Sequence, residues 1–139
     1  RLMPIDNGII LEKLLELNPN AIMLNAYGIG NAPVSDKTFM KILKRAIQQG
    51  VIVVDSTQCF HGTVNMSIYH TGRALAEVGV IGALDMTPEA VFTKLYYLFQ
   101  RYGENIDKIK RLLIQDIAGE LTEVKYTTIA PKVSNMVIS

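Results

Sequence analysis

The feature that most constrains this chain is the run Val51–Val54, four β-branched residues that directly follow Gly50. A run of this kind, with no polar residue in alternation, is typical of a strand that is buried on both faces, as in a parallel sheet. Parallel strands need long crossover connections, which are usually helices. The run therefore predicts an α/β fold in which helices cover both faces of a sheet.

Two other apolar segments fit strands of the same sheet. Residues 21–27 form a short apolar run between turn residues, and residues 80–83 form another. Residues 2–5 fit either a short first strand or an entry segment. The chain contains no internal repeat, so a repeat architecture is excluded.

Helical periodicity fills the intervals between these strands. Asp6 is a candidate cap for a helix that reaches Leu17, and further helices are predicted at 36–49, around 74–76 and near 104–115. The sequence Thr87–Glu89 gives the clearest helix start, with a capping hydroxyl, a proline at the first helical position and an acid in the first turn. This helix should run to about Arg101.

The alternation of strands and helices predicts a Rossmann-like three-layer sandwich with a small, mostly parallel sheet and helices on both faces. Ligands of such sheets bind beyond the carboxyl ends of the strands. In this sequence that edge comprises residues 27–33 and 55–62.

Composition excludes several classes of protein. The 139 residues are 49% hydrophobic, which argues against a disordered chain. A net charge of +1 gives no basic footprint for nucleic acid, and a single cysteine excludes an internal disulfide and a paired-cysteine zinc site. No apolar run approaches the roughly 18 residues of a membrane helix. The start at Arg1, without Met or a signal peptide, leads us to expect a piece of a longer polypeptide.

The first loop at the carboxyl edge begins like a dinucleotide fingerprint, with Gly28 and Gly30, but continues to Pro33. A tight turn is favoured over a phosphate site, and no cofactor is predicted. Asn31 fits two roles equally well. It could hydrogen-bond a ligand, or it could close a turn on its own backbone.

The second loop combines Cys59 and His61, which would suit a nucleophile and its base. A lone cysteine is more often a small buried hydrophobe. No metal site is predicted, because Cys59, His61 and His70 lack ligand-like spacing. Asp85 precedes the helix start, where a carboxylate is expected to satisfy backbone amides.

These same segments resemble the C-terminal domain of L-asparaginases of the cytoplasmic, type I kind. The resemblance is carried, in family order, by 27–33 (YGIGNAP), 50–54 with 57–59 (TQC), 62–65 (GTVN), 69–72, 76–82, 85–90 (DMTPEA), 94–95 and 119–122 (GELT). It covers residues 1 to about 123. The residues from Lys125 on have no counterpart, and 124–139 are predicted to be a tail, either disordered or packed as an extension.

The resemblance implies that the catalytic machinery lies elsewhere. Family members hydrolyse L-asparagine to L-aspartate and ammonia without a metal or cofactor, and their threonine nucleophile and Asp–Lys pair belong to an N-terminal domain. The threonine signatures of that domain are absent from these 139 residues. No catalytic residue is therefore predicted in this chain, and the chain alone is expected to be inactive.

Three roles remain that the resemblance implies for such a domain. It supplies interface in cytoplasmic dimers or tetramers, it contributes Asn31 to the active site of a partner subunit, and it forms an allosteric asparagine site. The residues expected at that last site are Asn25, Ala26, Tyr27, Gly28, Thr57 and Cys59. Close bacterial relatives can carry arginine where this chain has Asn25, and arginine is the better partner of an α-carboxylate. The alternative is an interaction domain without a ligand site, and neither interpretation involves nucleic acid or membrane.

Overall fold

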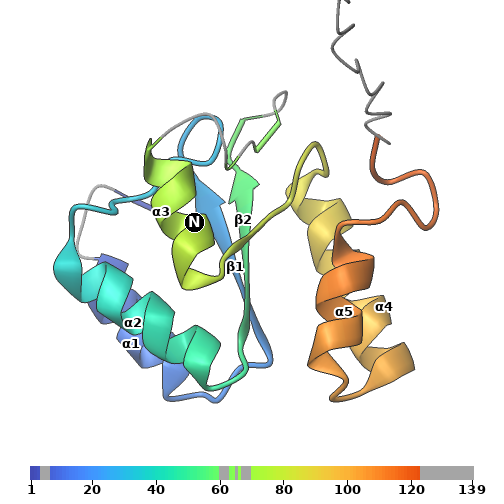
Figure 1. Cartoon of the computed structure of the whole chain (residues 1–139), viewed down its shortest axis with the longest axis horizontal. Helices are drawn as coiled ribbons and strands as arrows, with labels where there is room; N and C mark the ends of the chain where they lie inside the picture. Colours follow the sequence, from blue (N-terminus) through green and yellow to red (C-terminus); the bar gives the residue numbers. More distant parts are fainter. Residues whose placement is uncertain (4–6, 60–62, 65, 67–69, 123–139) are drawn as a thin grey trace, which may run out of the picture.

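The computed structural model describes residues 1–3, 7–59, 63–64, 66 and 70–122. Over this part of the chain, helices and strands alternate as the sequence predicts (Figure 1). The elements are α1 (Asn7–Leu15), β1 (Ala21–Ala26), α2 (Lys37–Gln48), β2 (Ile52–Thr57), α3 (His70–Val78), β3 (Ile81–Gly82), α4 (Pro88–Tyr102) and α5 (Ile106–Leu113).

The three strands form one parallel sheet in the order β1-β2-β3. β1 pairs with β2 over six residues, from Ala21 opposite Ile52 to Ala26 opposite Thr57. β3 pairs with β2 at two positions, with Ile81 opposite Val54 and Gly82 opposite Asp55. β2 is the central strand and all six of its residues are buried, which confirms the prediction of a strand covered on both faces.

Helices cover the two faces of this sheet (Figure 1). Leu24 and Val53 belong to one core cluster, which they share with residues of α1, α2 and α3. Ile52 and Val54 belong to a second cluster, which they share with residues of α4 and α5. Strand residues alternate between the two clusters because successive side chains point to opposite faces. The predicted α/β fold with helices on both faces is confirmed.

The structure corrects the extent of several elements. β2 continues through Asp55 to Thr57, residues that the sequence placed in a loop, because its pairing with β1 extends along the whole length of that strand. α3 begins at His70, earlier than predicted. Residues 1–3 are not a strand, although the backbone N–H of Leu2 donates to the carbonyl of Asn25 at 3.0 Å.

The start of α4 has the predicted cap. The Thr87 hydroxyl accepts a hydrogen bond from the backbone N–H of Ala90 at 3.2 Å, and Pro88 occupies the first helical position. We expect Thr87→Ala to lower the free energy of unfolding by about 1 kcal/mol, because one helix-start donor loses its partner. Urea denaturation of both proteins measures this difference, with Thr87→Ser as the control that keeps the hydroxyl.

Some predictions lie outside the described residues: the cap at Asp6, the role of His61 and the tail at 124–139. The domain boundary near residue 123 stays a prediction. Among the described helices, none has both the length and the apolar character needed to cross a bilayer.

Candidate functional site

A cavity of about 240 Å³ opens at the carboxyl edge of the sheet, where β1 and β2 end and α4 begins. Asn25, Thr57 and Cys59 line it from the strand ends. Asp85 and Glu89 line it from either side of the start of α4. The cavity therefore lies at the edge where parallel sheets of this kind bind their ligands.

The parallel pairing of β1 and β2 brings the predicted residues together. Thr57 lies opposite Ala26, one position beyond the pair Asn25 and Ser56. The Thr57 hydroxyl donates to the carbonyl of Gly28, and its oxygen accepts from the backbone N–H of Cys59 at 3.0 Å. One hydroxyl thus joins the two loops at this edge. The Thr57 side chain has a structural role as well as a place in the cavity wall.

The other predicted site residues lie beside the cavity rather than in its wall. Ala26 is fully buried in the core cluster on the α1 and α2 side of the sheet, and Tyr27 packs against the same cluster. Gly28 contributes its carbonyl to Thr57. Among the described residues, three of the six predicted positions, Asn25, Thr57 and Cys59, line the cavity.

Asn31 closes a tight loop after β1. Its backbone exchanges two hydrogen bonds with that of Tyr27, at 2.9 and 2.8 Å, across Gly28 and Gly30. Both glycines have positive φ, 52° and 105°, which few other residues adopt. The side-chain oxygen of Asn31 accepts from the hydroxyl of Thr71 at 2.6 Å. α3 therefore fixes the orientation of the Asn31 amide.

Gln58 is a residue of this edge to which sequence reasoning gave no role. Its Nε2 donates to the carbonyls of Leu2 and Asn25, at 2.9 and 2.6 Å, and its Oε1 accepts from Arg1 Nε at 2.7 Å. The position of Gln58 in the sequence could have indicated this role, because a polar side chain directly after a buried strand can reach the ends of neighbouring strands. Gln58 also lines the cavity.

A second unforeseen residue is Asp55, whose side chain lies in the interior. It is 0% exposed, and neither carboxylate oxygen has a hydrogen-bond partner among the described residues. Burial raises the pKa of Asp55 from 3.8 to about 7. A Cβ atom on Gly30 would lie 2.7 Å from Asp55 Oδ2 and 2.7 Å from Val64 Cγ1, so this carboxyl lies directly beneath the loop of Asn31.

The same region of the sheet carries two further polar atoms without partners in the described structure. These are Oδ1 of Asn25 and Oγ of Ser56, on adjacent strands in register. Asn25 lines the cavity, although its Oδ1 atom is itself buried. Unsatisfied buried polar atoms are rare in folded proteins, and a bound molecule is one means by which such atoms gain a partner.

Asp85 does not act as predicted at the helix start. Its carboxylate accepts from the backbone N–H of Thr122, at 3.1 and 3.3 Å, while Thr87 caps α4. Hydrogen bonding from Thr122 holds the pKa of Asp85 below its ordinary value. Asp85 therefore brings a formal negative charge to the cavity wall and fastens the segment after α5 to it.

Cys59 is exposed, which corrects the expectation of a small buried hydrophobe. Across the described residues, no three His, Cys, Asp or Glu side chains are grouped so that they could hold a metal ion.

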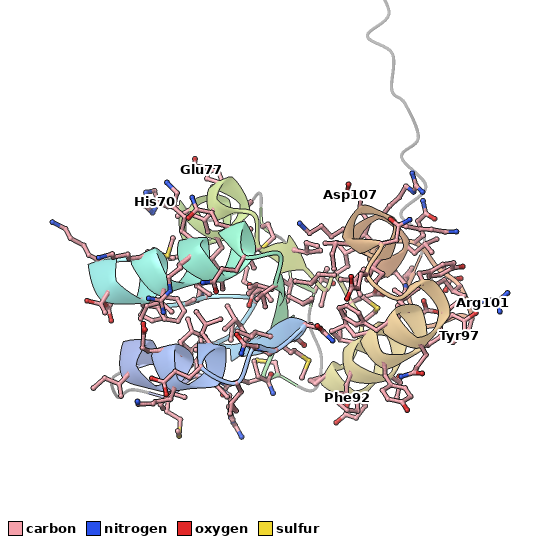
Figure 2. All side chains as sticks on the ribbon, turned by 90° about the horizontal axis from the view of Figure 1, so that it is seen from below. His70, Glu77, Phe92, Tyr97, Arg101 and Asp107 are labelled. Atoms are coloured by element: carbon pink, nitrogen blue, oxygen red, sulfur yellow. The ribbon has the colours of Figure 1, made fainter. Side chains whose placement is uncertain are left out.

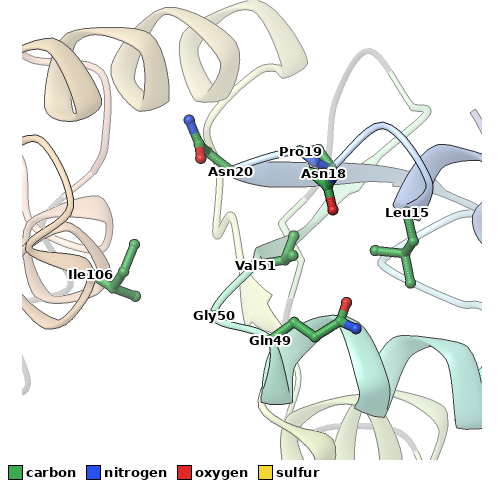
Figure 3. A pocket seen from close by; sticks show the side chains of 8 residues that line it. All are labelled: Leu15, Asn18, Pro19, Asn20, Gln49, Gly50, Val51 and Ile106. Carbon is green, nitrogen blue, oxygen red and sulfur yellow. The ribbon is translucent and has the colours of Figure 1, made fainter.

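A second cavity, of about 290 Å³, lies at the opposite, amino edge of the sheet (Figure 3). Asn18, Asn20 and Gln49 provide its polar groups, and none of its lining residues is titratable. It lacks the acid and thiol groups of the carboxyl edge and contains no residue predicted to be functional. We therefore take the carboxyl-edge cavity as the candidate site.

A doubly covered parallel sheet with a polar cavity at its carboxyl edge defines the class of α/β domains that bind ligands at strand ends. Comparison with known proteins gives the family. The model of the glutaminase/asparaginase C-terminal domain matches residues 1–113, and the chain belongs to that family.

Individual relatives agree with this assignment. The chain is 43% identical over 113 residues to L-asparaginase 1 of Escherichia coli K12, a match that covers 81% of this chain and 33% of that protein. The crystal structure of L-asparaginase I from Vibrio cholerae superimposes with a TM-score of 0.80 and 40% identity, covering 88% of this chain and 36% of that one. The thermostable L-asparaginase from Thermococcus kodakarensis superimposes with the same TM-score of 0.80 and 31% identity, covering 88% of this chain and 37% of that one. The chain thus spans about a third of the asparaginases it matches.

Proposed function

We propose that this domain is the C-terminal module of an enzyme that hydrolyses L-asparagine to L-aspartate and ammonia, and that it binds asparagine at the carboxyl edge as an effector. In this proposal an N-terminal domain supplies the catalytic threonines, and the module adds oligomer interface in the cytoplasm. By itself the 139-residue chain is expected to show no hydrolysis. No cofactor or metal is required.

The observation that carries the proposal is the cavity lined by Asn25, Thr57 and Cys59. Its volume of about 240 Å³ suits a small polar molecule. Its wall includes the side chain of Asn25, a thiol on Cys59 and the carboxylates of Asp85 and Glu89. Acceptors of this kind complement the ammonium and amide N–H groups of asparagine.

Asn31 is proposed to reach the substrate of a partner subunit. Its side chain is oriented by Thr71, since that hydroxyl donates to Oδ1. An amide held in one orientation presents its N–H₂ group at lower entropic cost than a rotating one. This proposal is separate from the effector site, because Asn31 does not line the cavity.

A second candidate function is an interaction domain without a ligand site. The observation that favours it is the charge of the cavity, because its lining residues include Asp85 and Glu89 but no lysine, arginine or histidine of the described chain. An α-carboxylate would have no cationic partner in this wall. Titration distinguishes the two functions.

We expect calorimetric titration of the 139-residue chain with L-asparagine to give saturable heat, and titration with D-asparagine or L-aspartate to give none. A ligand at about 100 times its dissociation constant should also raise the free energy of unfolding by about 2.7 kcal/mol. Absence of heat with all three compounds would contradict the effector site and favour the interaction domain.

Two variants locate the site. Cys59→Ser changes an exposed residue of the cavity wall, and it should weaken binding while the melting temperature stays unchanged. Thr57→Ala removes the hydroxyl that joins Gly28 and Cys59 and should weaken binding further. Glu77→Gln, an exposed change on α3 outside the cavity, is the matched control. An asparagine effect that survives Thr57→Ala would place the ligand elsewhere.

A further inference from the structure

The carboxyl of Asp55 lies beneath the loop that carries Asn31, and the proposed function gives it no role. Asp55 is 0% exposed, and neither of its side-chain oxygens has a partner in the part of the chain that the structure describes. A Cβ atom on Gly30 would lie 2.7 Å from Asp55 Oδ2 and 2.7 Å from Cγ1 of the fully buried Val64. The backbone of Gly30 and the side chain of Val64 therefore close over this oxygen.

The strand that carries Asp55 is the fixed side of this contact. β2 is the central strand of the sheet, and Asp55 pairs with Leu24 of β1 and with Gly82 of β3. The carbonyl of Asp55 also accepts from the backbone N–H of Ala83 at 2.8 Å. The carboxyl cannot move into solvent without loss of sheet pairing, so the loop above it is the side that can yield.

The seating of Gly30 on the carboxyl also determines where Asn31 lies. The backbone N–H groups of Gly30 and Asn31 both donate to the carbonyl of Tyr27, at 3.1 and 2.8 Å. The side chain of Asn31 accepts from the Thr71 hydroxyl at 2.6 Å. Raising Gly30 away from the sheet carries the next residue with it, and the bond between Asn31 and Thr71 is then lost.

No charged group of the described elements around Asp55 offsets an ionised carboxylate. The ionisable side chains there are Tyr27 at the end of β1 and, on α3, His70, Arg73 and Glu77. The three on α3 are exposed, and Figure 2 shows His70 and Glu77 pointing outward. The lysines and the arginine of α2 are exposed as well. Burial is the one cause that raises the pKa of Asp55 to about 7, so hydration is the means by which the ionised form is relieved.

We propose that Asp55 is a positioning residue for Asn31, and that loss of the Asp55 proton releases the loop 28–31 from the sheet. With the proton in place, Gly30 rests on a neutral carboxyl and Asn31 keeps its bond to Thr71. Without it, the carboxylate gains water when Gly30 rises, and Asn31 loses its fixed orientation. This inference rests on the proposed role of Asn31 toward a partner subunit's substrate and makes that role dependent on pH.

Amide hydrogen exchange of the full 139-residue chain, followed by NMR, tests the proposal at the N–H groups of Gly30 and Asn31. Opening lets Asp55 titrate near 3.8 instead of about 7, so the opening equilibrium should rise as the pH increases between these values and level off above them. After correction for the intrinsic pH dependence of exchange, we expect protection of both amides to fall at least about tenfold from about pH 5 to about pH 7. Low concentrations of urea should leave these rates unchanged, because a local opening exposes little surface.

Two substitutions separate the carboxyl from the rest of the fold. Asp55→Asn should make the protection of the loop amides independent of pH over this range, and Glu77→Gln, an exposed change on α3, should keep the wild-type profile. Gly30→Ala adds a Cβ atom 2.7 Å from Asp55 Oδ2, so it should leave the loop weakly protected at every pH. Its control is Gly50→Ala, also at positive φ but with nothing within 4 Å of the Cβ position, and it should leave the loop amides protected as in the wild type.

A wild-type profile that is flat over this range of pH would overturn the proposal. So would the same pH dependence in Asp55→Asn, or loop exchange that urea accelerates as it does global unfolding. If Asp55→Asn does not fold, the wild-type profile and its urea dependence decide the matter. The measurement uses no asparagine, so failure of the calorimetric titration would remove the effector site and leave the result for the loop intact.

Discussion

Asp55→Asn is expected to stabilise the domain above neutral pH and to remove most of its pH dependence between about pH 4 and pH 7. The carboxyl of Asp55 is fully buried without a partner among the described residues, and burial raises its pKa from 3.8 to about 7. The folded protein therefore keeps this proton up to about pH 7, whereas the unfolded chain releases it near its ordinary pKa.

The direction of this pH effect follows from the number of protons bound in the folded and the unfolded state. Between these two pKa values the folded state binds more protons than the unfolded state, so the free energy of unfolding falls as the pH rises. The full loss is about 4 kcal/mol and is reached above neutral pH. An amide cannot ionise, so we expect the Asp55→Asn variant to exceed the wild type by about 2–4 kcal/mol near pH 8 and to match it more closely near pH 4.

Urea denaturation at a series of pH values measures this difference. Glu77→Gln is the control, since Glu77 is an exposed carboxylate on α3 and its neutralisation should leave the curve parallel to that of the wild type. If Asp55→Asn instead lowers the stability at every pH, the carboxylate has a partner in the folded protein.

Glu120→Ala is expected to be among the most destabilising single changes in the chain, at about 3–5 kcal/mol, because it leaves a buried ammonium without its counter-charge. Lys94 Nζ lies 2.5 Å from Glu120 Oε1, and the Lys94 side chain is 4% exposed. The same ammonium donates to the carbonyl of Gln115 at 2.5 Å. Glu120 also accepts from the backbone N–H groups of Ile117 and Ala118.

The double variant Lys94→Met with Glu120→Ala should recover part of this loss, because no unpaired charge then remains at this position in the interior. Thermal or urea unfolding of the single and double variants gives the coupling energy directly. The matched control is Lys13→Met in the exposed pair Lys13–Glu16, where little change is expected. An equal effect in both pairs would contradict the role of burial.

Acid should weaken the same contact. Burial of Glu120 opposes ionisation, but its hydrogen bonds from Lys94, Ala118 and Ile117 outweigh this and lower its pKa from 4.5 to about 2. The stabilisation is therefore complete above about pH 4.5 and is lost as the pH falls toward 2. This slope is opposite in sign to that of Asp55, and the two can be resolved by comparing the variants.

The fold can be predicted from local sequence in those segments whose residue types are compatible with only one kind of local structure. The β-branched run at Val51–Val54 has few alternatives to a strand buried on both sides, and Thr87–Glu89 has few alternatives to a helix start. Both were predicted, and both are present in the structure. The carboxyl edge could also be predicted, because strand order and parallel pairing bring Asn25 and Thr57 together.

The charges of the interior could not be predicted in this way. A sequence containing Asp55 after an apolar run indicates a loop, since aspartate is depleted in strands, yet the ladder with β1 continues past it. Lys94 and Glu120 are far apart in the sequence, and only the packing of α5 on α4 brings the segment after α5 beside Lys94. Such contacts depend on tertiary structure, which overrides local preference.

Gln58 connects the carboxyl edge of the sheet to residues 1–3. A single amide group holds the carbonyl of Leu2 and that of Asn25. Gln58 thereby links residues 1–3 to Asn25, which lines the cavity. A displacement of residues 1–3 would therefore be transmitted to the cavity wall through Gln58. A ligand in the cavity would in turn affect the position of residues 1–3.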